Sequence, residues 1–235
     1  MSDPTQHTVK SYEQELELLK SIMARMGGLV ERQTALAIKA IVERNEEAAI
    51  EAPELDPEVD ELEREAEMLA IRILALRSPM AVDLREIVAA LKITGDLERI
   101  GDYASSISRR SLKLDSLDGN MSMTGLKNMG RLVQDNLRRV IDALTQRNRD
   151  LAIEVWQADT AVDELYTAMF RELMTYMMED PRYITSCIHL LFVAKHIERI
   201  GDHTTNIAER VYYAVTGQML PSERPRGGLK THPSE

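Results

Sequence analysis

The chain has 235 residues, of which 44% are hydrophobic and 29% are charged, as expected for a folded, soluble protein. Its 39 acidic residues outnumber 29 Lys and Arg, and the net charge of −10 argues against nonspecific nucleic-acid binding and against docking on an anionic membrane. A single cysteine, Cys187, excludes an intramolecular disulfide, and no apolar run is long enough for a signal peptide or a membrane span. We therefore expect a cytoplasmic protein.

Eleven Gly and eight Pro leave long stretches rich in Ala, Leu, Glu, Arg and Met, which predict an all-α fold. The dipeptides Asp56-Pro57, Ser78-Pro79 and Asp180-Pro181 are typical of helix starts, because the first side chain can cap the helix and proline fits its first position. Six long helices are expected, separated by breaks at 51–57, 77–79, 114–120, near 148 and at 179–181.

The two halves of the chain repeat one another. MGGLV at 26–30 corresponds to MGRLV at 129–133, and Arg44-Asn45 to Arg147-Asn148, both at an offset of 103. The pentapeptide ERIGD at 98–102 returns at 198–202, so the second half is three residues shorter between its second and third helices. These matches indicate an internal duplication and predict two tandem, pseudo-symmetric three-helix bundles. The expected boundaries are a flexible N-terminus at 1–8, a first bundle at 9–117, a second at 121–217 and a flexible tail at 218–235.

Each ERIGD copy carries two acids four residues apart. On a helix such acids are neighbours, and their repulsion costs about 0.2–0.5 kcal/mol. At about 100° per residue they lie opposite the apolar stripe of their helix, where solvent or a partner can reach them. Gly101 and Gly201 precede the second acid, and because Gly costs about 1 kcal/mol inside a helix, they predict a close approach by another helix or by a bound group.

A second pair of acids with the same spacing begins the middle helix of each half. If the middle and third helices are antiparallel neighbours, each bundle gathers four carboxylates, a set that suits hard cations such as Mg²⁺, Mn²⁺ or ferric iron. The candidate metal ligands are Asp56, Asp60, Glu98 and Asp102 in the first bundle, and Asp159, Asp163, Glu198 and Asp202 in the second.

A simpler interpretation is also open for the acids. The dipole of a helix favours acids at its start, and Glu63 and Glu67 extend the first set into a stripe that would suit a solvated face. His196 and His203 flank the second ERIGD copy, but Asp96 and Tyr103 replace them in the first. We therefore expect the two histidines to be accessory groups rather than primary metal ligands.

Together with the ERIGD copies, the segments MGGLVE at 26–31, LMTYMMED at 173–180 and NIAERVYYAVTGQ at 206–218 closely resemble the PhoU family, from about Tyr12 to Gln218. The resemblance implies a cytoplasmic, usually dimeric regulator of phosphate homeostasis that restrains phosphate uptake and the phosphate-starvation (Pho) regulon. It does so by linking a phosphate ABC transporter ATPase to a sensor histidine kinase. Some members carry metal clusters on E/D-x-x-x-D motifs, which match the eight acids above, and Fe, Mn, Mg and Zn all remain open here.

Three classes of function follow. The first is a regulatory adaptor that works by binding other proteins and contacts neither nucleic acid nor the membrane interior. The second is a di-metal carboxylate enzyme on a helical bundle, a class that needs a Glu-x-x-His motif absent from this chain. The third is a structural helical protein without a ligand, which leaves the doubled ERIGD unexplained. Because the sequence contains no nucleophile–base set, P-loop or dinucleotide fingerprint, we expect an adaptor without catalysis, and phosphate sensing through the transporter.

Overall fold

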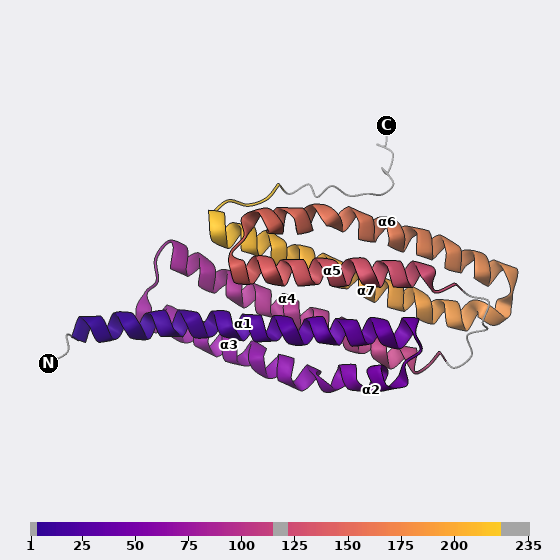
Figure 1. Ribbon diagram of the computed structural model, residues 1–235, viewed down its shortest axis with the longest axis horizontal. Coiled ribbons are helices and arrows are strands. Elements are labelled where there is room, and N and C mark those ends of the chain that lie inside the picture. Colours follow the sequence, from indigo (N-terminus) through magenta and orange to yellow (C-terminus); the bar gives the residue numbers. More distant parts are fainter. Residues whose placement is uncertain (1–3, 115–121, 222–235) are drawn as a thin grey trace.

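The structure is a computed structural model that describes residues 4–114 and 122–221. Every regular element in these ranges is helical, which confirms the predicted all-α fold (Figure 1). The elements in chain order are α1 (Pro4–Val42), α2 (Glu46–Glu54), α3 (Asp56–Arg77), α4 (Val82–Ser111), α5 (Thr124–Gln146), α6 (Arg149–Glu179), the 3₁₀ turn η1 (Pro181–Tyr183) and α7 (Ile184–Thr216).

The helices form two related units, α1 to α4 and α5 to α7. Helix α1 corresponds to α5, α4 corresponds to α7, and α2 with α3 corresponds to α6. The middle helix of the first unit is therefore present as two pieces. Pro53 lies inside α2, where it cannot donate a backbone hydrogen bond, and the helix is interrupted two residues later, at Leu55. The predicted pair of tandem three-helix bundles is thus confirmed, with one of the six long helices divided.

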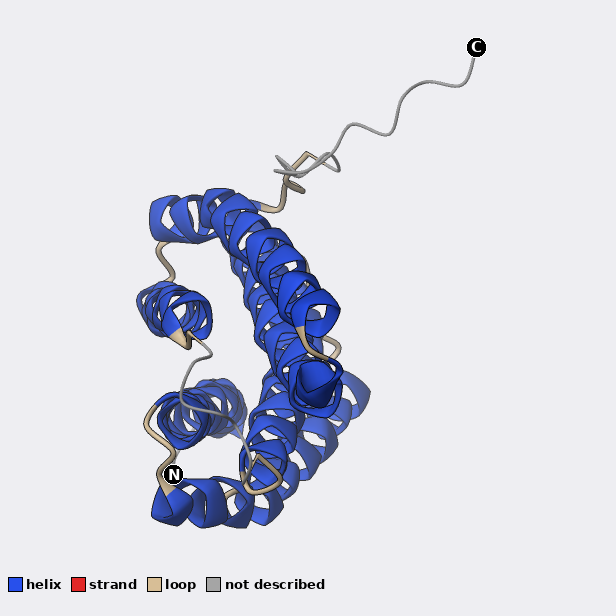
Figure 2. Ribbon diagram, turned by 90° about the vertical axis from the view of Figure 1, so that its right-hand side faces the viewer, coloured by secondary structure: helices blue, strands red, loops and turns tan. Residues whose placement is uncertain are grey.

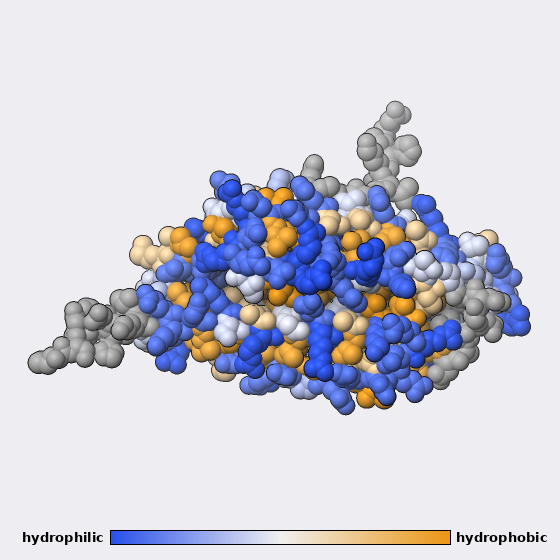
Figure 3. All heavy atoms as spheres, viewed as in Figure 1, coloured by the Kyte–Doolittle hydropathy of each residue, from blue (hydrophilic) through white to orange (hydrophobic). Residues whose placement is uncertain are grey.

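The helices are arranged in two layers. Helices α4 and α7 pack against each other at the centre, with α3 beside α4 and α6 beside α7. Helices α1 and α5 cover one side of this row, and Figure 2 shows them next to each other, opposite the stacked helices of the row. Figure 3 shows that the face seen in this view is largely hydrophilic, with hydrophobic groups scattered over it. The apolar core therefore lies between the layers and runs through both bundles as one cluster.

Two glycines let α1 and α5 pack closely where the bundles meet. A Cβ atom at Gly130 would lie 2.6 Å from Ile38 Cγ2, and one at Gly27 would lie 3.1 Å from Ile141 Cγ2. Gly27 corresponds to Gly130 in the repeat, and Ile38 corresponds to Ile141. The same glycine–isoleucine contact is thus made twice, which fixes α1 and α5 as antiparallel helices related by the internal pseudo-twofold axis.

The first helix of each unit ends in the same way. Arg44 and Arg147 both take a left-handed conformation, with φ of 54° and 53°. The asparagine that follows then caps the next helix: Asn45 accepts a hydrogen bond from the backbone N–H of Ala48, and Asn148 from those of Asp150 and Leu151. A break was predicted near Asn148, and its counterpart at Asn45 was not.

Two of the three predicted Pro-linked caps are wrong. The side chain of Asp56 does not cap α3, because its carboxylate is bound by residues of α1 and α4. Ser78 is the left-handed residue that ends α3, and α4 begins only at Val82. Asp180 does cap a helix, since its carboxylate accepts a hydrogen bond from the N–H of Arg182 at the start of η1.

The segment at 1–8 that was predicted to be a flexible N-terminus overlaps the first helix. Helix α1 begins at Pro4, where proline fits the first helical position, so the backbone is helical from residue 4 onward. Residues 1–3, 115–121 and 222–235 lie outside the described residues. They include most of the predicted break at 114–120 and most of the predicted tail at 218–235. No helix in the described part of the chain is both long and apolar enough to cross a membrane.

We predict that Gly130→Ala destabilises the protein by about 1–3 kcal/mol, because the new methyl group collides with the stiff, β-branched side chain of Ile38. The free energy of unfolding in urea measures the effect. Gly28→Ala is the matched control: no atom lies within 4 Å of its new Cβ, so it should leave stability unchanged or raise it by up to about 1 kcal/mol. Equal effects of the two substitutions would contradict the packing.

Candidate functional site

The two ERIGD copies lie side by side at the centre of the molecule. Helices α4 and α7 are antiparallel: Arg110 near the end of α4 lies over the ring of Phe192 near the start of α7, 4.2 Å from its centroid. At the other end of the pair, Arg210 of α7 donates to the carbonyl of Lys92 in α4, at 3.1 Å. Because both motifs lie between these two contacts, the motif of one bundle lies next to that of the other.

A polar lock joins α4 and α7 beside the motifs. The side chain of Asp96 is only 7% exposed, and its Oδ1 lies 2.8 Å from His203 Nδ1. Its second oxygen pairs with the guanidinium of Arg210. Burial is the main cause of a lowered pKa at His203, which favours the neutral imidazole. The two bundles are thus joined through a buried carboxylate that has both a histidine and an arginine partner.

An aromatic stack completes the junction on the other side of the motifs. The ring of Tyr103 lies 5.4 Å from that of His196 and 5.7 Å from that of His203, and Arg199 lies over the same tyrosine. Burial, followed by the charges of Arg110 and Arg199, lowers the pKa of His196 to about 4. Both histidines therefore belong to the contact between bundles, a role that their single occurrence in the repeat did not reveal.

The predicted close approach of a neighbour is found at Gly101, whereas a Cβ atom at Gly201 would make an ordinary van der Waals contact. A Cβ atom at Gly101 would lie 2.9 Å from Gln33 Oε1 of α1, and one at Gly201 would lie 3.4 Å from Val162 Cγ1 of α6. The nearest neighbour is thus another helix in both cases. It follows that Asp102 and Asp202, one residue further on, are turned away from this packed side.

The four candidate acids of the second bundle lie near one another. Burial, followed by the negative charges of Asp159, Glu198 and Asp202, raises the pKa of Asp163 to about 6. Asp159 is itself buried, and Lys195 of α7 bonds to Glu198 at 2.6 Å. The predicted gathering of acids from the middle and third helices is therefore present here, with one lysine at its edge.

In the first bundle the acids gather in a different combination. Burial, followed by the charge of Asp102, raises the pKa of Glu98 to about 7, and Glu63 contributes to this rise. The pKa of Glu63 is itself raised by burial and then by Asp60. Arg99 partly offsets the repulsion, because it lies 3.5 Å from both Glu98 and Asp102. Glu63 thus joins the cluster, although it was predicted only as part of a solvated stripe.

Asp56 is separated from this cluster by its own hydrogen bonds. Gln33 of α1 and Ser105 of α4 both donate to its Oδ1, the latter at 2.8 Å, and Arg109 donates to its Oδ2 at 3.2 Å. The carboxylate therefore ties three helices together. Its neutral and cationic partners already satisfy it without a metal.

A family model described as PhoU domain matches residues 23–111 and 126–211. The phosphate-specific transport system accessory protein PhoU homolog of Caulobacter vibrioides is 51% identical over 223 residues, which cover 94% of this chain and 97% of that protein. The corresponding homolog of Zymomonas mobilis is 46% identical over 221 residues, which cover 94% of this chain and 93% of that protein.

This chain belongs to the PhoU family.

Solved PhoU structures share its fold. The crystal structure of PhoU from Pseudomonas aeruginosa superposes with a TM-score of 0.86 at 39% identity, covering 88% of this chain and 100% of that one. The phosphate transport system regulatory protein PhoU from Streptococcus pneumoniae superposes with a TM-score of 0.81 at 27% identity. The match covers 89% of this chain and 99% of that one. The family resemblance and the tandem three-helix architecture are both confirmed.

The acids of this PhoU-family chain match the chemistry of a hard-cation site. All donors in each cluster are carboxylate oxygens, and their mutual repulsion is what a bound cation would relieve. Within residues 4–114 and 122–221, however, no three His, Cys, Asp or Glu side chains are arranged closely enough to form a metal site. The residues fit the predicted ions in type and charge, and metal binding stays a prediction.

We predict that Glu98→Gln raises the melting temperature more at about pH 8 than at about pH 5. The folded-state pKa of Glu98, about 7, exceeds the ordinary value of 4.5, so the folded protein binds the extra proton and loses stability as pH rises between these values. The neutral amide removes this loss. Thermal unfolding in the presence of a chelator measures the difference. Asp135→Asn, on the exposed face of α5, controls for the change in net charge, and a pH-independent effect of Glu98→Gln would refute the prediction.

Proposed function

We propose that this chain is a regulatory adaptor of phosphate homeostasis that acts in the cytoplasm, without catalysis. It represses the phosphate-starvation regulon and restrains phosphate uptake when phosphate is plentiful, by linking a phosphate ABC transporter ATPase to a sensor histidine kinase. The observation that carries the proposal is similarity over the whole chain. The matches to relatives named as phosphate-specific transport system accessory protein PhoU homologs cover more than nine-tenths of this chain and of each relative.

The arrangement of the two bundles suits an adaptor. One continuous apolar core and the buried Asp96 lock make the bundles a single scaffold with a related but distinct surface on each half. Arg99 lies beside the acids of the first half, whereas Lys195 bonds to Glu198 in the second. Two similar surfaces with different charge detail would let one molecule bind two different proteins. The homodimer that the family resemblance implies also remains a prediction.

We further propose that the two acidic clusters bind Fe, Mn, Mg or Zn ions. The cation would supply positive charge that relieves the repulsion among the carboxylates and would give an acidic surface a means of binding an acidic partner. Asp163 and Glu98, whose pKa values are raised to about 6 and about 7, lie where such a charge has most effect. Asp56 plays a structural part in this proposal, through its bonds to Gln33 and Ser105.

The regulatory function is tested in the source bacterium. Deleting the gene should raise expression of a phosphate-starvation reporter about tenfold or more in phosphate-rich medium, and a plasmid copy of this chain should restore repression. A reporter that stays repressed in the deletion strain would overturn the proposal. A point variant that fails to complement should be checked for normal abundance, because loss of stability alone lowers the amount of protein.

Metal binding is tested by elemental analysis of untagged protein that has been purified without a chelator. We expect about one or more ions per chain in the wild type and less than one-tenth of that after amide replacement of the four ERIGD acids, because the oxygen donors are lost. Asp135→Asn with Asp142→Asn, two acids of α5 outside the clusters, should leave the metal content unchanged. Wild-type protein without metal would contradict the proposal. The replaced acids are Glu98, Asp102, Glu198 and Asp202.

A further inference from the structure

Both phenylalanines of this protein lie on its surface. The sequence contains only Phe170 and Phe192, and their residues are 43% and 48% exposed. A phenylalanine is ordinarily among the most buried residue types, and burying it contributes up to about 3 kcal/mol to folding. Aromatic residues placed in solvent without a folding benefit are typical of protein interfaces.

The two phenylalanines belong to one patch at the tip of the second bundle. Helices α6 and α7 run antiparallel, since Lys195 lies over Tyr166 and Glu209 accepts a hydrogen bond from Trp156. In this register an exposed stripe of α6 runs alongside an exposed stripe of α7, each with residues spaced four apart, on the outer side of the pair. We call this surface the tip patch; it consists of Phe170, Met174 and Met178 on α6 and Ile184, Ile188 and Phe192 on α7.

The tip patch is not a simple product of the duplication. In the first bundle Leu84 and Val88 occupy the positions of Ile184 and Ile188, and they too are exposed. The positions that correspond to the two phenylalanines, however, hold Glu67 and Lys92. The second half therefore has aromatic residues at two positions that are charged in the first half, on a surface that carries exposed apolar residues in both.

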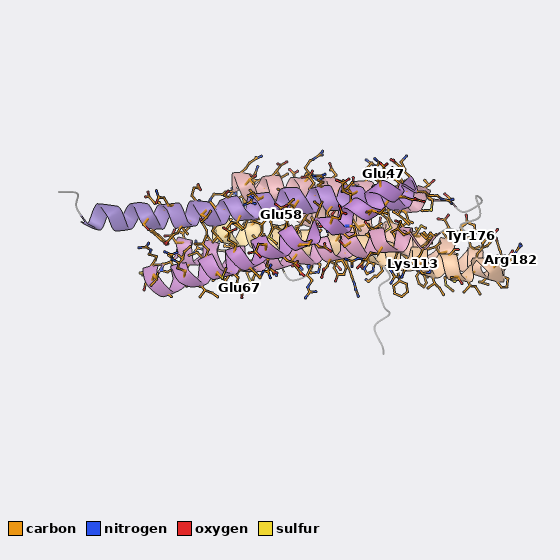
Figure 4. The ribbon with its side chains drawn as sticks, turned by 90° about the horizontal axis from the view of Figure 1, so that it is seen from below. Glu47, Glu58, Glu67, Lys113, Tyr176 and Arg182 are labelled. Atoms are coloured by element: carbon orange, nitrogen blue, oxygen red, sulfur yellow. The ribbon has the colours of Figure 1, made fainter. Side chains whose placement is uncertain are left out.

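One edge of the tip patch is basic. The guanidinium of Arg110, near the end of α4, lies over the ring of Phe192, and Lys113 follows one turn later. Figure 4 shows Lys113 where α4 ends next to α7, with Arg182 farther out at the tip. Neither Arg110 nor Lys113 forms an ion pair with any of the residues that the structure describes. In a chain of net charge −10, this edge is suited to an acidic partner.

We propose that the tip patch docks an amphipathic helix with an acidic flank, supplied by one of the two proteins that the proposed function links. The two exposed apolar stripes lie side by side and form one face against which the apolar stripe of a third helix can pack. Methionines suit such a face, because their flexible side chains adapt to the partner. The acidic flank lies over Arg110 and Lys113, which fixes the orientation of the bound helix. This inference rests on the proposed function, because it assigns a surface to one of its partners.

The test measures binding of the purified transporter ATPase, and separately of the cytoplasmic part of the sensor kinase, to the full chain. We expect Phe170→Ser with Phe192→Ser to weaken binding of one of the two proteins about 30-fold or more and to leave the other unchanged. Leu84→Ser with Val88→Ser, at the corresponding positions of the first bundle, is the matched control and should bind both as the wild type does. Because all four residues are exposed, helicity and melting temperature should be retained in each variant.

A second variant tests the charge. Arg110→Glu with Lys113→Glu should weaken binding of the same protein, and the loss should shrink at high salt. Unchanged binding of both proteins by the serine variant, with a binding-competent wild type, would overturn this inference alone. A wild type that binds neither protein would overturn the proposed function and this inference with it. If the wild type is a dimer that the serine substitutions dissociate in sedimentation, the occupant is a second copy and the inference is wrong.

Discussion

The antiparallel packing of α4 against α7 is the constraint on which the rest of the molecule depends. It places the two ERIGD motifs next to each other, with Asp96 against His203 on one side and Tyr103 against His196 on the other. Because the motif glycines face inward to neighbouring helices, the acids that follow them face outward. The relative position of the two acidic clusters is therefore set by neighbouring residues of α4 and α7, and not by the acids themselves.

The duplication makes two kinds of contact between the halves occur twice, once for each pair of corresponding positions. Contacts between a residue and the pseudo-symmetric copy of its partner are retained, as in the glycine–isoleucine packing of α1 on α5. Positions 96 and 103 of the first half meet positions 203 and 196 of the second half in the same symmetric way, but here the residues differ between the halves. Asp96 bonds to His203, whereas their counterparts His196 and Tyr103 stack on each other, so differences at two repeat positions give the junction two different contacts. The same divergence gave one tip of the molecule its two exposed phenylalanines.

The sequence predicts most of the fold, because helix propensity and the internal repeat are local signals. The break at Asn45 could have been predicted, because Arg44-Asn45 repeats the dipeptide Arg147-Asn148. Pro57 gave a stronger local signal for a helix start, and the break was predicted there instead. The acidic site was only partly predictable. Motif spacing found Asp163 and Glu98, whereas the inclusion of Glu63 and the separate role of Asp56 depend on which side chains other helices bring near them. Such tertiary contacts have no signature within a single helix.

A double-mutant cycle on unfolding, between Asp96→Ala and His203→Ala, tests the central claim most directly. If the buried carboxylate and the imidazole hold the two bundles together, the two losses of stability should be coupled by about 0.5–3 kcal/mol, as expected for residues in direct contact. The unfolding transition of the wild type should also be single, because one core runs through both bundles. Additive losses, or two separate transitions in the wild type, would show instead that the bundles are independent and that α4 and α7 do not set the relation between the acidic clusters.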